Sequence, residues 1–475
     1  MKLSSVIFLI ALGFASIAQN KQFNNWHFTD HCGLSFNTNP PSIFYGAAIS
    51  TDEGSSSISD TLGNVLFYTD GVTVWDKTNT PMPNGNGLNG SYTSTQSALI
   101  IPMPFSTTKY YVFTTDAQAG VITSITCGCL AYSIVDMSLN GGLGDVTIKN
   151  NILHTPVTEK LTAYKHANDS CIWLVAHEWN SDHFLSYLIS PSGVNATPIV
   201  SATGSSHCCV ANNANAIGQM KIAPDGTKLV YILHSDEKIE LFKFDRSSGQ
   251  VSDPITITAD VSISFQQLYG LEFSPNSSLV YVTTASLYQS NHIIQFSLKK
   301  WNANDIGASR KHIQGPYFNP YIFGQAQLAP DGKIYVSNYG SYALGVINSP
   351  DSIGTKCNYV PFQTSTNGKL RLGLPNYMPG FYRTPPPPDD AFCDSEPVIP
   401  NVVTPNGDGI NDEFKITCNG YLFIPESLIL YNRWGKEVYH SDKNNELKRL
   451  SDGTYFYVLR FNGSSYKGYL TVLGE

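Results

Sequence analysis

Short runs of alternating apolar and polar residues, separated by turn-forming residues, dominate the chain. Three runs share one form: an apolar strand end, a Pro-Asp or Pro-Asn turn and a second alternating strand. They are residues 223–232 (APDGTKLVYI), 273–282 (FSPNSSLVYV) and 328–336 (LAPDGKIYV). Proline presets φ for such a turn, and Asp, Asn and Gly accept the positive φ that reverses the chain. A further apolar strand follows each copy and the copies recur roughly every fifty residues, so the pattern predicts four-stranded β-propeller blades.

Less regular copies of this strand and turn pattern occur earlier, at residues 60–75, 109–115 and 171–176. Counting them gives six blades. Residues 26–36 and 357–382 are expected to build a seventh together, because pairing both ends of the chain closes the ring and removes open sheet edges. The sequence therefore predicts an all-β fold with a seven-bladed propeller over residues 20–383, with six and eight blades as alternatives.

A second domain is predicted after a proline-rich segment. Residues 384–396 contain four consecutive prolines, Pro385 to Pro388, which favour a stiff extended linker. Residues 397–475 then show about seven short strand signals in eighty residues, including an Asn462-Gly463 hairpin turn. This density of strands predicts a small Ig-like β-sandwich.

The C-terminal segment resembles the type B C-terminal sorting domain of Bacteroidetes, also called the gliding-motility-associated C-terminal domain. The resemblance implies export to the extracellular space or outer-membrane surface by way of the periplasm, with the type IX secretion machinery as a partner. The residues that carry it are Pro405, Asn406, Gly407, Asp408, Gly409, Asn411, Asp412, Trp434, Gly435, Asp452, Gly453 and Tyr455.

The N-terminal region also resembles a known class, the exported propeller proteins of Bacteroidetes that carry the same sorting domain. The matching stretches are residues 26–36, 63–75, 82–85, 94–97, 135–145 and 373–377. This resemblance implies architecture and export, and it implies no particular biochemical activity.

The N-terminus agrees with export. Lys2, an apolar run from Val6 to Ala15 and the small residues Ser16 and Ala18 predict a signal peptide over residues 1–18. No segment has the length and apolar character of a transmembrane helix.

The net charge of −8 provides no basic stripe for phosphates, so a nucleic-acid partner is not expected.

Nine cysteines follow the signal peptide, and export permits disulfides. Cys393 and Cys418 flank the first strand region of the C-terminal domain and are interpreted as a bridge. Structural disulfides are also the interpretation for Cys127-Gly-Cys129 and for Cys208-Cys209, with metal or redox chemistry as the alternative.

Two segments contain residue types that are common metal ligands. His177, Glu178 and His183 are interpreted as hydrogen-bonded strand-end residues, because the H-E-x-x-H helix geometry is absent. Asn406, Asp408 and Asp412 have spacings similar to those of the ligands in an EF-hand loop. The segment is interpreted as a tight Asx-type turn, with a calcium site as the alternative.

The functional hypothesis is a secreted or cell-surface binding and adhesion protein whose propeller face holds an extracellular glycan or protein. The alternative is a propeller enzyme that degrades an extracellular polymer, either a glycosidase or a lyase. No catalytic residue is assigned, because isolated carboxylates such as Asp70, Asp116 and Glu178 do not reveal a pair from sequence alone.

Overall fold

The computed structural model describes most of the chain after residue 20. The described residues are 21–117, 127–207, 211–258, 267–286, 290–317, 322–380, 398–404, 414, 416–418, 421–423, 427–440, 452–461 and 464–473. Two compact units are present, Met1–Pro385 and Pro386–Glu475. The predicted signal peptide lies outside the described residues, so it stays a prediction.

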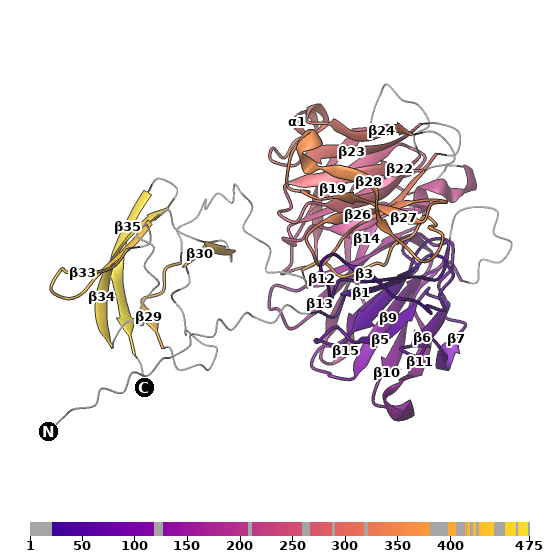
Figure 1. Ribbon diagram of the computed structural model, residues 1–475, viewed down its shortest axis with the longest axis horizontal. Coiled ribbons are helices and arrows are strands. Elements are labelled where there is room, and N and C mark those ends of the chain that lie inside the picture. The colour runs from indigo at the N-terminus through magenta and orange to yellow at the C-terminus, as the bar shows by residue number, and fades with distance from the viewer. Residues whose placement is uncertain are drawn as a thin grey trace. The chain divides into compact units, whose positions relative to one another are not determined.

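Seven antiparallel sheets follow one another around a ring in the first unit, which is a β-propeller (Figure 1). Blades 1 to 3 are built in chain order from these strands: β4 (Ser56–Ser59), β5 (Val65–Thr69), β6 (Thr73–Asp76) and β7 (Pro81–Asn86); β8 (Ala98–Pro102), β9 (Lys109–Thr115), β10 (Leu130–Asp136) and β11 (Asp145–His154); β12 (Val157–Lys165), β13 (Ile172–Glu178), β14 (His183–Ser190), β15 (Gly193–Val194) and β16 (Ile199–Ala202).

Blades 4 to 6 repeat the plan, and blade 7 is a three-stranded sheet from the N-terminus. Their strands are β17 (Met220–Ile222), β18 (Lys228–Leu233), β19 (Lys238–Phe244) and β20 (Val251–Thr258); β21 (Leu268–Phe273), β22 (Leu279–Thr284), β23 (Asn291–Ser297) and β24 (Lys311–Tyr317); β25 (Phe323–Leu328), β26 (Ile334–Asn338), β27 (Ala343–Ile347) and β28 (Tyr359–Ser365); and β1 (Asn25–Phe28), β2 (Cys32–Ser35) and β3 (Ser42–Ile43). The prediction of seven blades is confirmed.

Within the described ranges, helix is confined to short segments between strands. They are α1 (Ala303–Ala308), η1 (Asn140–Gly142), η2 (Ala211–Ala216) and η3 (Gly354–Cys357). Asn302 caps α1, since its side chain accepts a hydrogen bond from the Asp305 backbone N–H at 2.9 Å.

The Pro-Asp and Pro-Asn repeats form the predicted turns between the first and second strands of blades 4, 5 and 6. In each turn a backbone N–H bonds to the carbonyl three residues before it, and Gly226, Ser277 and Gly332 adopt φ values of 73°, 61° and 78°. A Cβ on Gly226 would lie 2.4 Å from the Tyr164 ring, so glycine is required there for space as well as for φ.

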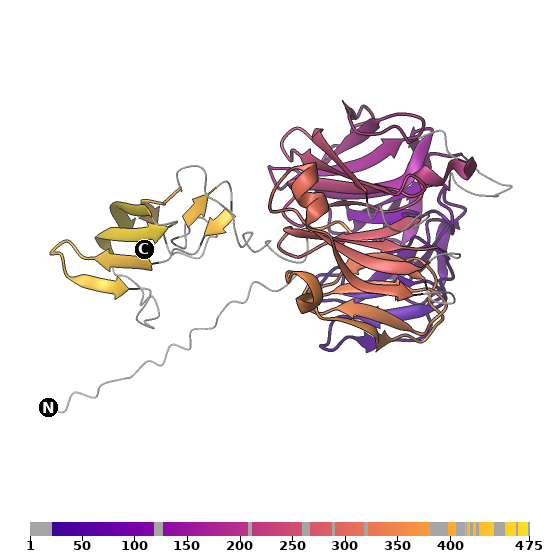
Figure 2. The same ribbon diagram turned by 90° about the horizontal axis from the view of Figure 1, so that it is seen from above.

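Both ends of the propeller chain meet at the ring closure, but they do not build one blade together as predicted. β28 belongs to blade 6, and the described strands of blade 7 are the N-terminal β1, β2 and β3. Asn367 donates to the His31 carbonyl at 2.8 Å and accepts from the Gly33 N–H at 3.0 Å, while Pro375 pairs with Ser55 of blade 1. Figure 2 shows the indigo N-terminal strands beside the orange strands of blade 6. Tyr377 completes the closure with a hydroxyl bond to Ser57 at 2.8 Å.

The core runs between neighbouring blades. The innermost and second strands are almost entirely buried: every residue of β21 and β22 is enclosed. Outermost strands such as β11 and β20 are largely exposed. This gradient explains why the second strands, such as β13 and β18, contain apolar runs whereas the outer strands show no such run.

The second unit is a separate all-β body with two sheets. Its strands are β29 (Val402–Val403), β30 (Ile416–Cys418), β31 (Tyr421–Phe423), β32 (Ser427–Tyr431), β33 (Glu437–His440), β34 (Gly453–Phe461) and β35 (Ser464–Val472). The larger sheet has the order β29-β35-β34-β32-β33, and β30 pairs with β31. Leu428, Leu430, Leu459, Leu470 and Val472 form its core. The predicted small β-sandwich is confirmed.

Candidate functional site

The innermost strands of blades 1 to 6 all begin at one end of the ring, named the mouth end here. Their first residues lie close together, since Gln96, two residues before β8, accepts a hydrogen bond from the N–H of Met220, the first residue of β17, at 2.8 Å. The Pro-Asp and Pro-Asn turns follow the inner strands and so lie at the opposite end.

Three buried glutamines join non-neighbouring blades at the mouth end. Gln96 Oε1 accepts from Leu161 in blade 3 and from Met220 in blade 4. Gln219 Oε1 accepts from the N–H of Leu271 in blade 5 and from that of Ala326 in blade 6. Gln325 of blade 6 donates to the Thr95 carbonyl. These amides reach two or three blades around the ring and together form a hydrogen-bonded floor beneath the mouth.

Two glutamates lie together at this floor. Glu159 Oε2, on buried β12, accepts from the Thr95 N–H and hydroxyl, both at 2.9 Å. Burial, followed by the charge of Glu159, raises the pKa of Glu53 well above its usual range. Glu53 Oε2 and the hydroxyl of Tyr269, which is 2% exposed, are buried without a normal hydrogen bond among the described residues. Glu53 therefore keeps its proton to a higher pH than an exposed glutamate does.

Lys160 extends this cluster. Its ammonium is buried and donates to three carbonyls, those of Asn215 at 2.9 Å, Ala216 at 3.0 Å and Ile217 at 2.7 Å. Burial lowers the pKa of Lys160 to about 7, partly opposed by the charge of Glu159. The cluster thus combines a carboxyl of raised pKa with an amine of lowered pKa, a combination common at functional sites.

A second ionisable cluster lies at the same end of blade 3. Glu178 Oε1 is 2.7 Å from His154 Nε2, and Glu178 Oε2 is 2.8 Å from His183 Nδ1. The three side chains are 23–40% exposed. Glu178 and His183 are hydrogen-bonded strand-end residues, as predicted, and His154 is a further partner that was not predicted. Within the described residues, no group of three or more His, Cys, Asp or Glu side chains has an arrangement that could hold a metal.

His177 and His207 form a buried pair with Nδ1 atoms 2.7 Å apart. Burial lowers the pKa of His177 to about 3, and burial together with His177 places the pKa of His207 well below its usual value. Both rings are therefore neutral at ordinary pH, and one Nδ1–H donates to the other nitrogen. Cys208 and Cys209 lie beyond the described residues, so the disulfide expected there stays a prediction.

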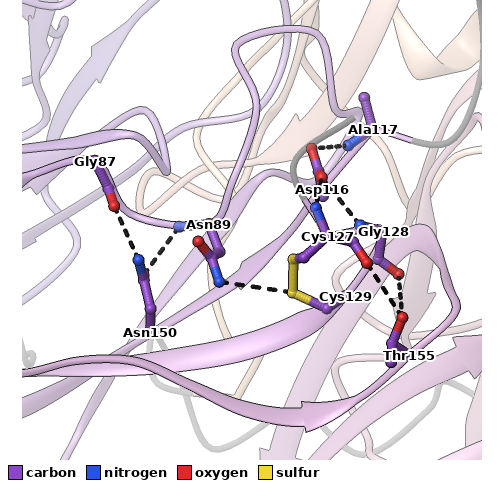
Figure 3. Close-up of a disulfide and its surroundings, with 9 residues drawn as sticks. All are labelled: Gly87, Asn89, Asp116, Ala117, Cys127, Gly128, Cys129, Asn150 and Thr155. Atoms are coloured by element: carbon purple, nitrogen blue, oxygen red, sulfur yellow. Dashed lines mark hydrogen bonds between the residues drawn. A yellow bond between two sulfur atoms is a disulfide. The ribbon is translucent and has the colours of Figure 1, made fainter. Parts of the chain in front are cut away.

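The predicted Cys127–Cys129 disulfide is present (Figure 3). Asp116 Oδ2 accepts the N–H groups of Cys127 at 2.9 Å and Gly128 at 3.0 Å, while the Asn89 amide lies 3.8 Å from Cys129 Sγ. The Asp116 carboxylate thus has a structural task, which is to hold the short disulfide loop between β9 and β10.

Exposed side chains surround these clusters. Tyr92, which precedes β8, is 54% exposed, and Tyr342, in the turn between β26 and β27, is 62% exposed. Arg371 Nη1 lies 3.6 Å from Asp52 Oδ1 beside them. Aromatic rings next to fixed polar groups are typical of binding surfaces.

The structure also describes the positions of several other residues singled out in the sequence. Asp70 caps the turn between β5 and β6 by accepting the N–H groups of Val72 and Thr73. Trp434 is 74% exposed in the turn between β32 and β33, and Gly435 follows it with a φ of 76°. Asp452 and Gly453 are exposed at the start of β34, and Tyr455 is buried in the same strand.

The remaining predicted residues lie outside the described part of the chain. They are Pro405, Asn406, Gly407, Asp408, Gly409, Asn411, Asp412 and Cys393. The calcium site and the Cys393–Cys418 bridge are therefore still predictions. Glu53, Glu159 and Lys160 were not expected from sequence. The only available signal was the charged pair Glu159-Lys160 inside an otherwise buried strand.

A comparison with protein families decides the role of the second unit. Residues 398–472 match the CHU_C type IX secretion signal domain. The chain carries a type IX secretion signal. The match covers most of the C-terminal body, and it means that the protein is exported to the cell surface or extracellular space. Among the described residues, no helix has the length and apolar character needed to cross a membrane.

Solved structures similar to the chain include several enzymes. A 6-phosphogluconolactonase-like protein from Bacteroides uniformis is 13% identical, with 74% of this chain and 93% of that chain covered and a TM-score of 0.43. Streptogramin B lyase is 9% identical, with 76% and 88% covered and a TM-score of 0.36. Hydrazine synthase from Kuenenia stuttgartiensis is 11% identical, with 78% and 93% covered and a TM-score of 0.37. No curated protein matches the chain in sequence.

Proposed function

We propose that the exported propeller is a binding and adhesion protein whose mouth end holds an extracellular glycan or protein. One observation carries the proposal: exposed tyrosines and hydrogen-bonded ionisable side chains occur together at the mouth end. The mouth end carries exposed Tyr92 and Tyr342, and the half-buried Glu178 cluster lies at the same end of blade 3. At the opposite end, turn polar groups bond to one another, as when Ser277 Oγ accepts from the Asp225 N–H.

These side chains suit a polar ligand. Tyrosine rings stack on the apolar faces of sugars or peptides and lose little conformational entropy. Glu178 is held by two imidazoles, so it is already oriented before a ligand arrives. The hydrogen-bonded glutamine floor keeps the blades, and hence these groups, in fixed positions.

The test is a binding screen of the full-length protein against a glycan array and extracellular proteins. Tyr92→Ala and Tyr342→Ala each weaken binding of any hit by about tenfold, because aromatic anchors dominate interface energies. Leu62→Ala is the matched control, since Leu62 is 76% exposed in the blade 1 turn at the opposite end. A hit whose affinity is unchanged in both tyrosine variants and falls in Leu62→Ala refutes the assignment of the mouth end.

The Glu53 and Glu159 pair favours a second candidate function, hydrolysis or elimination on an extracellular polymer. Under this hypothesis Glu53, whose pKa is raised, acts as the general acid and Glu159 as the general base. The measurement is release of reducing ends or unsaturated products from a polysaccharide panel. Both Glu53→Gln and Glu159→Gln abolish any such activity under this hypothesis, and activity retained in both variants excludes it.

A further inference from the structure

The large sheet of the secretion signal domain has one buried and one open face. Along β34 the residues alternate strictly, with Tyr455, Tyr457 and Leu459 buried in the core and their neighbours turned outward. The open face of an antiparallel sheet is normally polar where it meets water. Here it is not.

An aromatic row crosses this open face. Phe456 on β34 lies directly opposite Tyr431 on β32 and Tyr469 on β35. Residues opposite one another on adjacent strands point to the same face, so the three rings form a row across three strands. Phe456 and Tyr469 are each 50% exposed, and Tyr431 is half-buried. The row is separate from the domain core on the other face.

Two basic residues flank the row on one side of the same face, and exposed Glu437, opposite Tyr431 on β33, lies at the other. Val458 is two positions beyond Phe456 and pairs with Lys467, and Arg460 follows two positions further along. Lys467 and Arg460 are both exposed. Clustered exposed aromatic and apolar side chains mark interaction sites, and the positive charges beside them select a partner with negative charges.

We propose that this aromatic row, with Lys467 and Arg460 at its border, is the docking surface of the secretion signal. The partner is a folded component of the type IX secretion machinery whose surface is apolar and edged by acidic side chains. The family match motivates this choice, because residues 398–472 include all three strands of the row and have a secretion signal as their role. The rings of the row do not pack in the core of the domain, so packing does not account for their apolar character.

The experiment expresses the full chain in a bacterium with an active type IX secretion system and measures its distribution between periplasm and medium or cell surface. Phe456→Thr combined with Tyr469→Thr removes the two exposed rings and keeps strand-forming residues. The secreted fraction is expected to fall by about tenfold, because loss of aromatic anchors weakens docking by that factor or more. Arg460→Glu combined with Lys467→Glu is expected to give a similar loss.

Two controls separate docking from folding. Tyr45→Thr with Leu62→Thr removes two exposed side chains from the propeller, 78% and 76% exposed, and leaves secretion unchanged. Phe456→Tyr with Tyr469→Phe keeps the aromatic row, so this variant is expected to be secreted like the wild type. Limited proteolysis of the purified variants reports whether the C-terminal body is folded.

Normal secretion of the folded Phe456→Thr, Tyr469→Thr protein overturns the proposal. It is also overturned if the purified wild type is a dimer that this variant converts to monomer while secretion continues, since the row then binds a second copy. If the threonine variant proves unfolded, the Arg460→Glu, Lys467→Glu protein decides, because exposed charges alter the surface and not the core.

Discussion

The buried position of Lys160 predicts an unusual pH dependence of propeller stability. An exposed lysine has a pKa near 10.4, whereas burial lowers the pKa of Lys160 to about 7. Between these values the unfolded chain binds a proton that the folded propeller has released. The unfolded state therefore holds more protons in this window, and the contribution of Lys160 to the free energy of unfolding increases as the pH rises from about 7.

The size of the effect follows from the shift. Each pH unit within the window is worth about 1.4 kcal/mol, so raising the pH from 6 to 9 adds about 2–3 kcal/mol from Lys160. Lys160→Met keeps a long unbranched side chain and has no titrating group. The variant is less stable overall, because the carbonyls of Asn215, Ala216 and Ile217 lose their donor.

Urea unfolding at several pH values measures the difference. Five of the six tryptophans are in the propeller unit, so a Trp434→Phe background makes intrinsic fluorescence report that unit alone. The gap in free energy of unfolding between this background and Lys160→Met is expected to widen by about 2–3 kcal/mol from pH 6 to 9. Lys77→Met is the control, since Lys77 is exposed and its removal leaves the profile unchanged. A constant gap across this range would show that Lys160 keeps an ordinary pKa, and the reasoning from burial would be wrong.

Three further outcomes are expected. In urea titrations, Glu53→Gln is expected to become more stable relative to wild type as the pH rises from 5 to 8. The reason is that the raised pKa of Glu53 makes the folded wild type lose stability above the ordinary glutamate range. A pH-independent difference contradicts this. Replacing Cys127 and Cys129 by serine costs only about 1.5–2 kcal/mol by thermal or urea unfolding, because the bridge closes a very short loop; a loss above about 4 kcal/mol contradicts it. Gln96→Leu costs about 3–5 kcal/mol in the same assay, because buried N–H groups of two blades lose their acceptor, and a loss below about 1 kcal/mol argues against the glutamine floor.

Local turn chemistry made most of the fold predictable. Pro224, Pro275 and Pro330 begin turns that have one geometry in the structure, and each lies between strands whose alternation is visible in the sequence. The meeting of both chain ends was predictable because a ring of sheets has open edges until its ends join. The assignment of residues 359–365 to blade 6 was not, because a single apolar strand does not show which sheet it joins. The Cys127–Cys129 bridge followed from the spacing of the two residues and the oxidising environment.

The floor of the mouth was not predictable in the same way. Glu53, Glu159 and Tyr269 come from three different blades and are far apart in the chain, so no motif joins them. Their proximity depends on how the sheets are arranged around the ring, which local patterns do not encode. The aromatic row was also hidden, because Phe456 lies among other aromatic residues and only the strand register shows which of them face outward.

The way in which the ring is joined has a consequence for when the propeller folds. Tyr377 bonds to the Asn25 carbonyl at 3.3 Å, a contact between residues 352 positions apart. Such distant contacts form slowly, and chain synthesis supplies the last partner only after almost the whole propeller has been made. A nascent chain that ends before Leu374 lacks the segment that unites blades 6 and 1, so its incomplete ring presents unpaired strands to chaperones and proteases until translation passes that point.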